Sequence, residues 1–121
     1  MGILFCFVAA VAFCGLGLGG LLAPAPLATA FGIPTEDAGG LRFVCATAAR
    51  DLAFGIAIAL LAGMGERRAL IVLMLAGLVI PLSDLRLVRA HRGKTRAQVV
   101  HALGALAMLA TAAVLRYESG S

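Results

Sequence analysis

Two full charges, Arg50 and Asp51, stand next to each other in a run from Phe43 to Met64 that is otherwise almost wholly apolar. A charged side chain at membrane depth costs at least about 2.5 kcal/mol on insertion scales and marks a functional-site hypothesis by default. A carboxyl group can act as an acid or a base, whereas a guanidinium can only donate hydrogen bonds or fix a charge. The stretch therefore predicts a buried charged cluster that other helices must shelter.

Asp84 and His101 complete the set of candidate residues. Asp84 follows Pro81 by three residues, about one turn from the inner end of the third apolar segment, and His101 lies about one turn into the fourth. Both are therefore expected at a depth close to that of Arg50, whose interhelical partner we predict to be Asp84. Two carboxyls in one low-dielectric pocket push their proton affinities apart, which suits an acid and a base. The predicted catalytic residues are Asp51 and Asp84, as the acid and base, with Arg50 and His101 as their supports.

The composition identifies the chain as an integral membrane protein. Of its 121 residues, 62% are hydrophobic and 13% are charged, which leaves too little polar surface to cover a soluble domain of this size. A membrane-crossing helix needs about 20 mostly apolar residues. Four such segments can be drawn, over residues 3–23, 43–64, 69–88 and 97–115. Because open strands leave their backbone unsatisfied in lipid, we predict an all-α fold, a single four-helix transmembrane bundle, with a short disordered tail over 116–121.

The basic residues predict an orientation in the membrane. One side of the predicted bundle carries six of them, namely Arg42, Arg86, Arg89, Arg92, Lys94 and Arg96, and the other side carries three, Arg67, Arg68 and Arg116. An excess of Lys and Arg is typical of cytoplasmic loops. We therefore expect a multi-pass protein of the plasma membrane with both termini outside. The bilayer is the expected partner, and nucleic acid is not, because the basic residues form no patch interleaved with aromatic ones.

The first apolar segment resembles a retained helix more than a secretory signal. No Lys or Arg precedes its apolar run, and the run exceeds the usual ~7 to 15 residues. Its glycines at 15, 17, 19 and 20 allow close helix packing; the alternative is that they leave space for a ligand. The connection that follows is broken by prolines at 24, 26 and 34 and is partly apolar, so we expect a loop at the interface, packed there or acting as a lid.

Four uncharged residues share the helix faces that carry the charged or titratable residues. Thr47 and Gly55 share a stripe with Asp51, Gly77 shares a face with Asp84, and Met108 continues the stripe of His101. We predict that these four neighbours bind substrate: Thr47, Gly55, Gly77 and Met108. Pro81 clashes with the carbonyl four residues back, which belongs to Gly77, so the third segment is expected to kink there.

The order and spacing of several short motifs resemble a family of small four-span membrane proteins of unknown function. The motifs are Arg50-Asp51-Leu52-Ala53-Phe54-Gly55, Arg67-Arg68-Ala69-Leu70, Pro81-Leu82-Ser83-Asp84, and a His at the start of the last helix with Gly104-Ala105 behind it. Leu22-Ala23-Pro24 and Phe31-Gly32-Ile33-Pro34 resemble that family's first connection, so the resemblance covers almost the whole chain. It implies the four-span fold and draws attention to the charged residues. It implies no reaction.

Two classes of function remain open for the cluster. In the first, the protein is an enzyme that acts on a lipophilic small molecule by acid–base chemistry, such as isomerisation, cyclisation or epoxide opening, without a cofactor. In the second, the charges form a structural network in a binding protein or carrier, and a carrier of this size would need to form a homo-oligomer. No metal site is predicted, because His91 and His101 lack the close spacing of zinc ligands. The cysteines have no Cys-x-x-Cys spacing and are expected to be packing residues.

Overall fold

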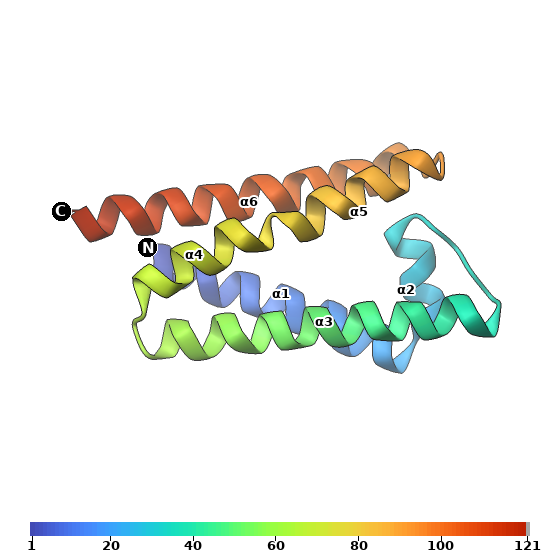
Figure 1. The fold of residues 1–121 in the computed structure, drawn as a ribbon, viewed down its shortest axis with the longest axis horizontal. Coiled ribbons are helices and arrows are strands. Elements are labelled where there is room, and N and C mark those ends of the chain that lie inside the picture. The colour runs from blue at the N-terminus through green and yellow to red at the C-terminus, as the bar shows by residue number, and fades with distance from the viewer. Residues whose placement is uncertain (121) are drawn as a thin grey trace.

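The computed structural model describes residues 1–120, and these form six α-helices and no strand (Figure 1). The helices are α1 (Gly2–Leu22), α2 (Pro24–Phe31), α3 (Ala38–Gly63), α4 (Arg67–Gly77), α5 (Val79–Ala90) and α6 (Thr95–Gly120). Four stretches are long and apolar enough to cross a membrane: α1, α3, α4 together with α5, and α6. The predicted all-α membrane bundle is therefore confirmed.

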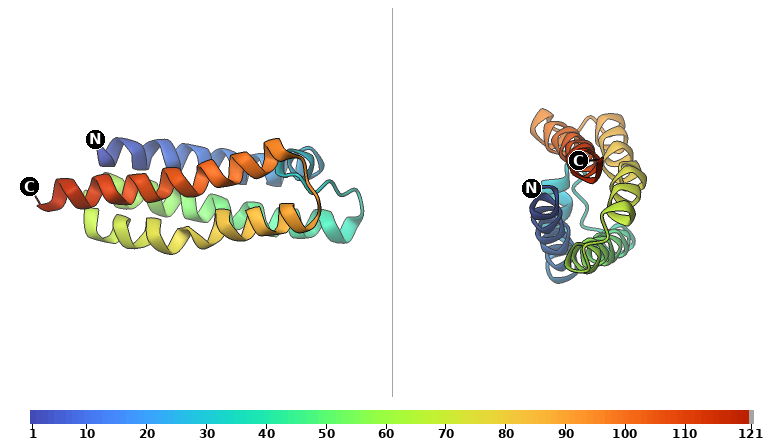
Figure 2. Two further views of the ribbon diagram at one scale, coloured as in Figure 1. Left: turned by 90° about the horizontal axis from the view of Figure 1, so that it is seen from above. Right: turned by 90° about the vertical axis from the view of Figure 1, so that its left-hand side faces the viewer.

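The long helices form two groups. α1 packs along α3, and α6 packs along α4 and α5. Both chain termini lie at one end of the bundle, and α2 stands between the two groups at the other end (Figures 1 and 2). The terminal amino group of Met1 forms an ion pair with Glu118 at 2.8 Å, which ties α1 to α6. The termini therefore share one face of the bundle, as an even number of crossings requires.

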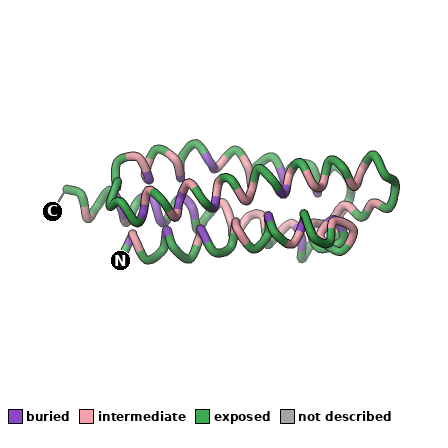
Figure 3. The backbone as a smooth tube through the Cα atoms, turned by 90° about the horizontal axis from the view of Figure 1, so that it is seen from below, coloured by how far each residue is buried: buried purple, intermediate pink, exposed green. Residues whose placement is uncertain are grey.

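The core is built from aliphatic side chains of four helices. Ile58, Leu70, Met74 and Leu115 are among the largest fully buried side chains. The outside of the bundle is also apolar, with exposed residues such as Val11 and Leu106. Figure 3, in which exposed residues are green, shows that such residues occur along all the long helices. A surface of this kind needs lipid around it.

Glycines bring α1 and α3 into close contact. A Cβ atom on Gly17 would lie 2.5 Å from Cβ of Leu52 and 2.6 Å from its backbone nitrogen, and one on Gly20 would lie 2.5 Å from Cβ of Ala48. The space left by these two missing side chains is thus filled by α3, and the alternative that it is open to a ligand is wrong. Gly15 and Gly19 have no such neighbour within 4 Å of an added Cβ.

The connection between the first two spans is more ordered than expected. Part of it is the helix α2, which begins at Pro24 and ends at Phe31. Gly32 caps this helix in the left-handed conformation (φ 103°). α3 then begins at Ala38, ahead of the predicted start at 43, because Asp37 caps it. The Asp37 carboxylate accepts hydrogen bonds from the Gly40 backbone N–H (2.7 Å) and from Thr35 Oγ1 (2.7 Å).

The end of the chain also differs from the prediction. α6 continues through Gly120, so the expected disordered tail is wrong for residues 116–120, and residue 121 lies outside the described residues. The extra turn is held by Glu118, which accepts hydrogen bonds from the Gly2 backbone N–H (3.1 Å) besides pairing with Met1. The sequence gives this interaction no local signal, because its partners stand at opposite ends of the chain.

The third span breaks where the proline pattern predicts. α4 ends at Gly77, about one turn before Pro81, and α5 begins at Val79. A proline ring in a helix displaces the carbonyl four residues earlier, and Gly77 offers little helix propensity to resist the break. The break redirects α5, which carries Asp84.

Candidate functional site

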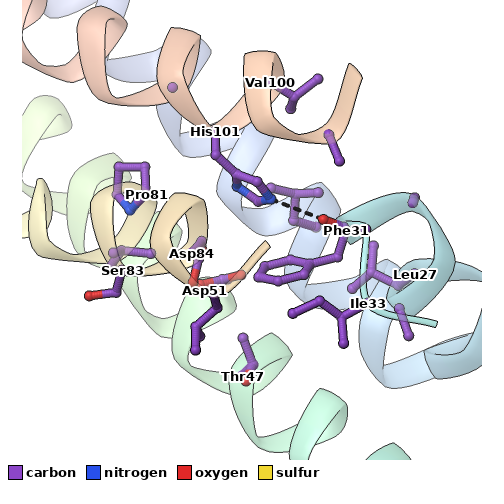
Figure 4. A pocket seen from close by; sticks show the side chains of 18 of the residues that line it. Leu27, Phe31, Ile33, Thr47, Asp51, Pro81, Ser83, Asp84, Val100 and His101 are labelled. Carbon is purple, nitrogen blue, oxygen red and sulfur yellow. Dashed lines mark hydrogen bonds between the residues drawn. The ribbon is translucent and has the colours of Figure 1, made fainter. Parts of the chain in front are cut away.

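A cavity of about 1610 Å³ lies between the two groups of helices. Its walls come from α1, α2, α3, α5 and α6, and most of the side chains that line it are apolar. α2 contributes Leu27 and Phe31 to the lining, and Ile33 follows from the next loop (Figure 4). The connection expected at the interface is therefore a wall of the cavity.

Arg50 joins the two carboxyl groups. Its Nη2 lies 2.8 Å and its Nε 3.1 Å from Oδ1 of Asp51, while Nη2 lies 4.0 Å from Oδ2 of Asp84 on α5. The predicted contact with Asp84 is present, but the closest partner of Arg50 is its own neighbour in the chain. Adjacent residues diverge on a helix, yet the long guanidinium arm folds back far enough to reach the shorter carboxylate. Local spacing alone did not reveal this.

Asp84 is the more enclosed of the two carboxyl-bearing residues. The difference is small, because the side chain of Asp84 is 11% exposed and that of Asp51 is 13% exposed. Among the described residues, no group donates a hydrogen bond to Asp84, whereas Asp51 accepts two from Arg50. The two carboxyls thus share Arg50 but contact it differently, Asp51 through two hydrogen bonds and Asp84 through an ion pair at 4.0 Å. Carboxyls in unequal environments can divide into an acid and a base.

His101 is held by α2. Its Nε2 lies 3.1 Å from the carbonyl oxygen of Phe31, and the two rings make an edge contact with centroids 4.6 Å apart. Figure 4 shows Asp51 and Asp84 turned toward the same space, with the Phe31 ring beside them. Arg50, Asp51, Asp84 and His101 all line the cavity, and nothing in the sequence indicated that Phe31 contacts His101.

Arg50, Asp84 and His101 line the same cavity although they lie at different distances from the ends of their helices. Arg50 follows Ala38, the first residue of α3, by twelve positions, or about 18 Å at 1.5 Å per residue. Asp84 and His101 are each six positions, or about 9 Å, from the end of α5 and the start of α6. The difference is taken up by the first turns of α3, which project beyond α5 and α6 (Figure 1).

The predicted substrate-binding residues divide into two groups. Thr47 and Met108 line the cavity. Gly55 and Gly77, which were predicted to lie beside a ligand, are not among the residues that line it. An added Cβ on Gly55 would meet Sγ of Cys14 at 2.7 Å, and one on Gly77 would meet Cε of Met108 at 2.6 Å. Both glycines serve close packing between helices.

No group of three or more His, Cys, Asp or Glu residues that could hold a metal ion occurs within residues 1–120. The three cysteines are free thiols, with Cys6 in the core. Besides the two carboxyls, Arg50 and His101, the lining of the cavity includes His91 and three further basic residues, Arg92, Lys94 and Arg96.

Comparison with known proteins places the chain in a family but assigns no activity. No curated protein and no solved structure matches it. One family model matches residues 10–115, which run from the first half of α1 to near the end of α6 and include the charged cluster. This match confirms the resemblance to a four-span family of unknown function. The chain belongs to the family described as a domain of unknown function, DUF4267.

Proposed function

We propose that this multi-pass membrane protein is an enzyme that binds a lipophilic small molecule in the cavity and acts on it by acid–base chemistry. The proposal is carried by the position of Asp51 and Asp84, which come from different helices, share Arg50 at unequal distances and stand at the wall of one largely apolar cavity. An apolar pocket with a few converging polar groups is the default site hypothesis.

The size of the cavity favours a large apolar ligand. Its volume of about 1610 Å³ exceeds the range of roughly 300–1,000 Å³ for ordinary small-molecule pockets. The lining includes Phe5 and Val8 of α1, which are 40% and 63% exposed, so the cavity is not enclosed there. The cavity therefore reaches the lipid-facing surface, and a lipophilic molecule can enter from the bilayer without crossing water.

The contacts suggest a role for each residue. Asp51, held by two hydrogen bonds from Arg50, is the carboxylate that takes a proton, and Asp84 is the carboxyl that gives one. In an isomerisation or cyclisation, Asp84 protonates a double bond or oxygen while Asp51 removes a proton from a carbon; the proton then returns to Asp84. In epoxide opening, Asp51 takes a proton from the attacking water and Asp84 protonates the epoxide oxygen. None of these reactions needs a cofactor.

A second candidate function is non-enzymatic binding or carriage of the same kind of molecule. The contacts that favour it are the pairing of Arg50 with Asp51 inside one helix and the contact of His101 with the Phe31 carbonyl. In that case the cluster is a structural network, and a carrier would function as a homo-oligomer.

The test begins with the molecule that accompanies the protein from its own membranes. Native mass spectrometry and lipid extraction identify it, and the wild type, Asp51→Asn and Asp84→Asn are then incubated with it. We expect wild type to convert it and each variant to be slower by about 10²-fold or more. Glu66→Gln is the matched control, because Glu66 is exposed and lies outside the cavity lining.

The outcomes separate the two functions. If the molecule binds to wild type and is recovered unchanged, the protein is a binding protein or carrier. If both variants keep full activity, Asp51 and Asp84 are not the acid and base, and the enzymatic proposal is wrong.

A further inference from the structure

A cluster of basic side chains at one end of the cavity has no role in the acid–base function. Arg92, Lys94 and Arg96 line the cavity at the turn between α5 and α6. Within residues 1–120, the side-chain ion pairs of basic residues are made by Arg50 and Arg67, and none of these three takes part in one. Three positive charges are thus available to a ligand.

The turn that carries the cluster is fixed in place. The Gly93 backbone N–H donates to the Val88 carbonyl (2.8 Å), and Gln98 Nε2 donates to the Gly93 carbonyl (2.9 Å). Arg92 has a φ of 55°, the left-handed conformation that non-glycine residues adopt rarely and that persists only where the surroundings enforce it. A basic excess in a loop can serve membrane orientation alone. Orientation requires neither a fixed turn nor side chains that line a cavity.

The cavity extends from this cluster far along α6. Arg96 and Thr111 both line it, and the fifteen positions between them correspond to about 22 Å of helix. The far part of the lining is mostly apolar and includes Phe5 and Val8 of α1, and the Thr111 hydroxyl there already donates to the Ala107 carbonyl. The cavity therefore offers a positive end and a long apolar body.

We propose that the cavity binds an amphiphile with a phosphate head, which Arg92, Lys94 and Arg96 hold while its hydrocarbon part lies along α1 and α6. This inference rests on the proposed function, because it names the class of substrate for the same cavity. Guanidinium groups bind phosphate through paired hydrogen bonds, and several cations together suit a multiply charged head better than a single carboxylate.

The carboxyl residues give the ligand a direction. Asp51 and Asp84 stand in the wall of the same cavity, and a carboxylate there repels a phosphate. Arg50, the cation beside them, already pairs with both carboxyls, whereas the three basic residues of the turn make no ion pair within residues 1–120, so the phosphate head is favoured at the turn. With its head at the basic cluster, the ligand presents its hydrocarbon part to Asp51 and Asp84.

The experiment uses the full chain in nanodiscs of neutral phosphatidylcholine, with empty nanodiscs to correct for partition into lipid. The probes are dodecyl phosphate, dodecanol with the same chain, and inorganic phosphate. We expect dodecyl phosphate to bind at least tenfold more tightly than dodecanol, with a preference that weakens as salt rises. Arg92→Gln/Arg96→Gln, which keeps only Lys94 of the three cations, should lose most of this preference. Arg68→Gln/Arg116→Gln, which changes two exposed arginines that do not line this cavity, should keep it.

Each contrary result has a separate meaning. Equal binding of dodecanol and dodecyl phosphate to wild type would overturn the phosphate-head inference and leave the lipophilic site in place. If inorganic phosphate binds as tightly as dodecyl phosphate, the site takes the free anion, and the inference that its ligand is an amphiphile is wrong. If Arg92→Gln/Arg96→Gln still binds dodecanol, which shows that it is folded, and keeps the full preference for dodecyl phosphate, the phosphate head does not bind at this turn. Failure of both amphiphiles to bind saturably would contradict the proposed function as well.

Discussion

Nη2 of Arg50 lies 4.0 Å from Oδ2 of Asp84, and this ion pair joins α3 to α5 across the wall of the cavity. The same nitrogen lies 2.8 Å from Asp51, so a single guanidinium serves carboxyls from two helices. Because α3 and α5 belong to different helix groups, the contact connects the two sides of the bundle beside the proposed site.

The Arg50–Asp84 contact predicts coupled effects on stability. Arg50→Gln should lower the free energy of unfolding by about 1–3 kcal/mol, less than the about 3–5 kcal/mol for breaking a fully buried pair, because the Arg50 side chain is 43% exposed. Arg50→Gln/Asp84→Asn should lose less than the sum of the single changes. Unfolding in detergent measures the cycle, and the cycle of Arg86→Gln with Asp84→Asn is the control, with additive losses expected. Additive losses in the Arg50 cycle would show that the two groups do not interact in solution.

The glycines of α1 predict opposite effects at neighbouring positions. Gly17→Ala should destabilise the protein by about 1–3 kcal/mol, because its new Cβ would meet the backbone of Leu52 and force α1 away from α3. Gly15→Ala meets nothing within 4 Å and should be neutral or stabilising by about 0.5–1 kcal/mol through helix propensity. Thermal unfolding of the two variants provides the comparison. Equal effects at both positions would contradict the close approach of the helices.

These glycines also show how far the sequence predicts the fold. Apolar length predicts the four spans, and Pro81 with Gly77 predicts the break in the third, because those signals are local. Whether a glycine faces a partner or open space depends on the neighbouring helix. Gly55 therefore looked like part of a ligand site, although it packs against Cys14 of α1.

The site was predictable to a similar extent. Charges inside apolar segments are costly, so Arg50, Asp51, Asp84 and His101 stood out by residue type alone. Their partners did not, because the contact between His101 and Phe31 depends on how α2 folds back between the helix groups. The closest partner of Arg50 depends on the rotamer of a long side chain, and helix spacing does not determine it.

The cap of α3 predicts a pH dependence. The hydrogen bond from the Gly40 backbone N–H, followed by that from Thr35, holds the pKa of Asp37 below its ordinary value. A carboxyl whose pKa is lowered in the folded state stabilises the fold above its ordinary pKa, and this contribution is lost as the pH falls through the lowered value. Asp37→Ala should therefore lower the melting temperature at neutral pH, and the difference from wild type should shrink in acid. Asp37→Asn, which can still cap, should lose less. A difference that is independent of pH would rule out the ionised cap.

The arrangement of charges predicts the topology in the membrane. In a variant without its three cysteines, Lys94→Cys should react with a membrane-impermeant maleimide from the cytoplasmic side alone. Ser119→Cys should react from the outside alone, because the two residues lie at opposite ends of α6. The basic excess near Lys94 favours that side as cytoplasmic. Labelling of both sites from the same side would contradict the four-helix bundle. Labelling of Lys94→Cys from outside and of Ser119→Cys from the cytoplasm would contradict the predicted orientation.

We propose that a lipophilic molecule binds in the cavity beside Asp84. Variants that fill the cavity test this claim most directly. Ala107 lines the cavity, whereas Ala53 is exposed on α3 and does not. Native mass spectrometry of protein purified from its own membranes should find the bound molecule reduced at least tenfold in Ala107→Trp and unchanged in Ala53→Trp, with matched melting temperatures. Full occupancy in Ala107→Trp would place the molecule on the outer surface and contradict the claim.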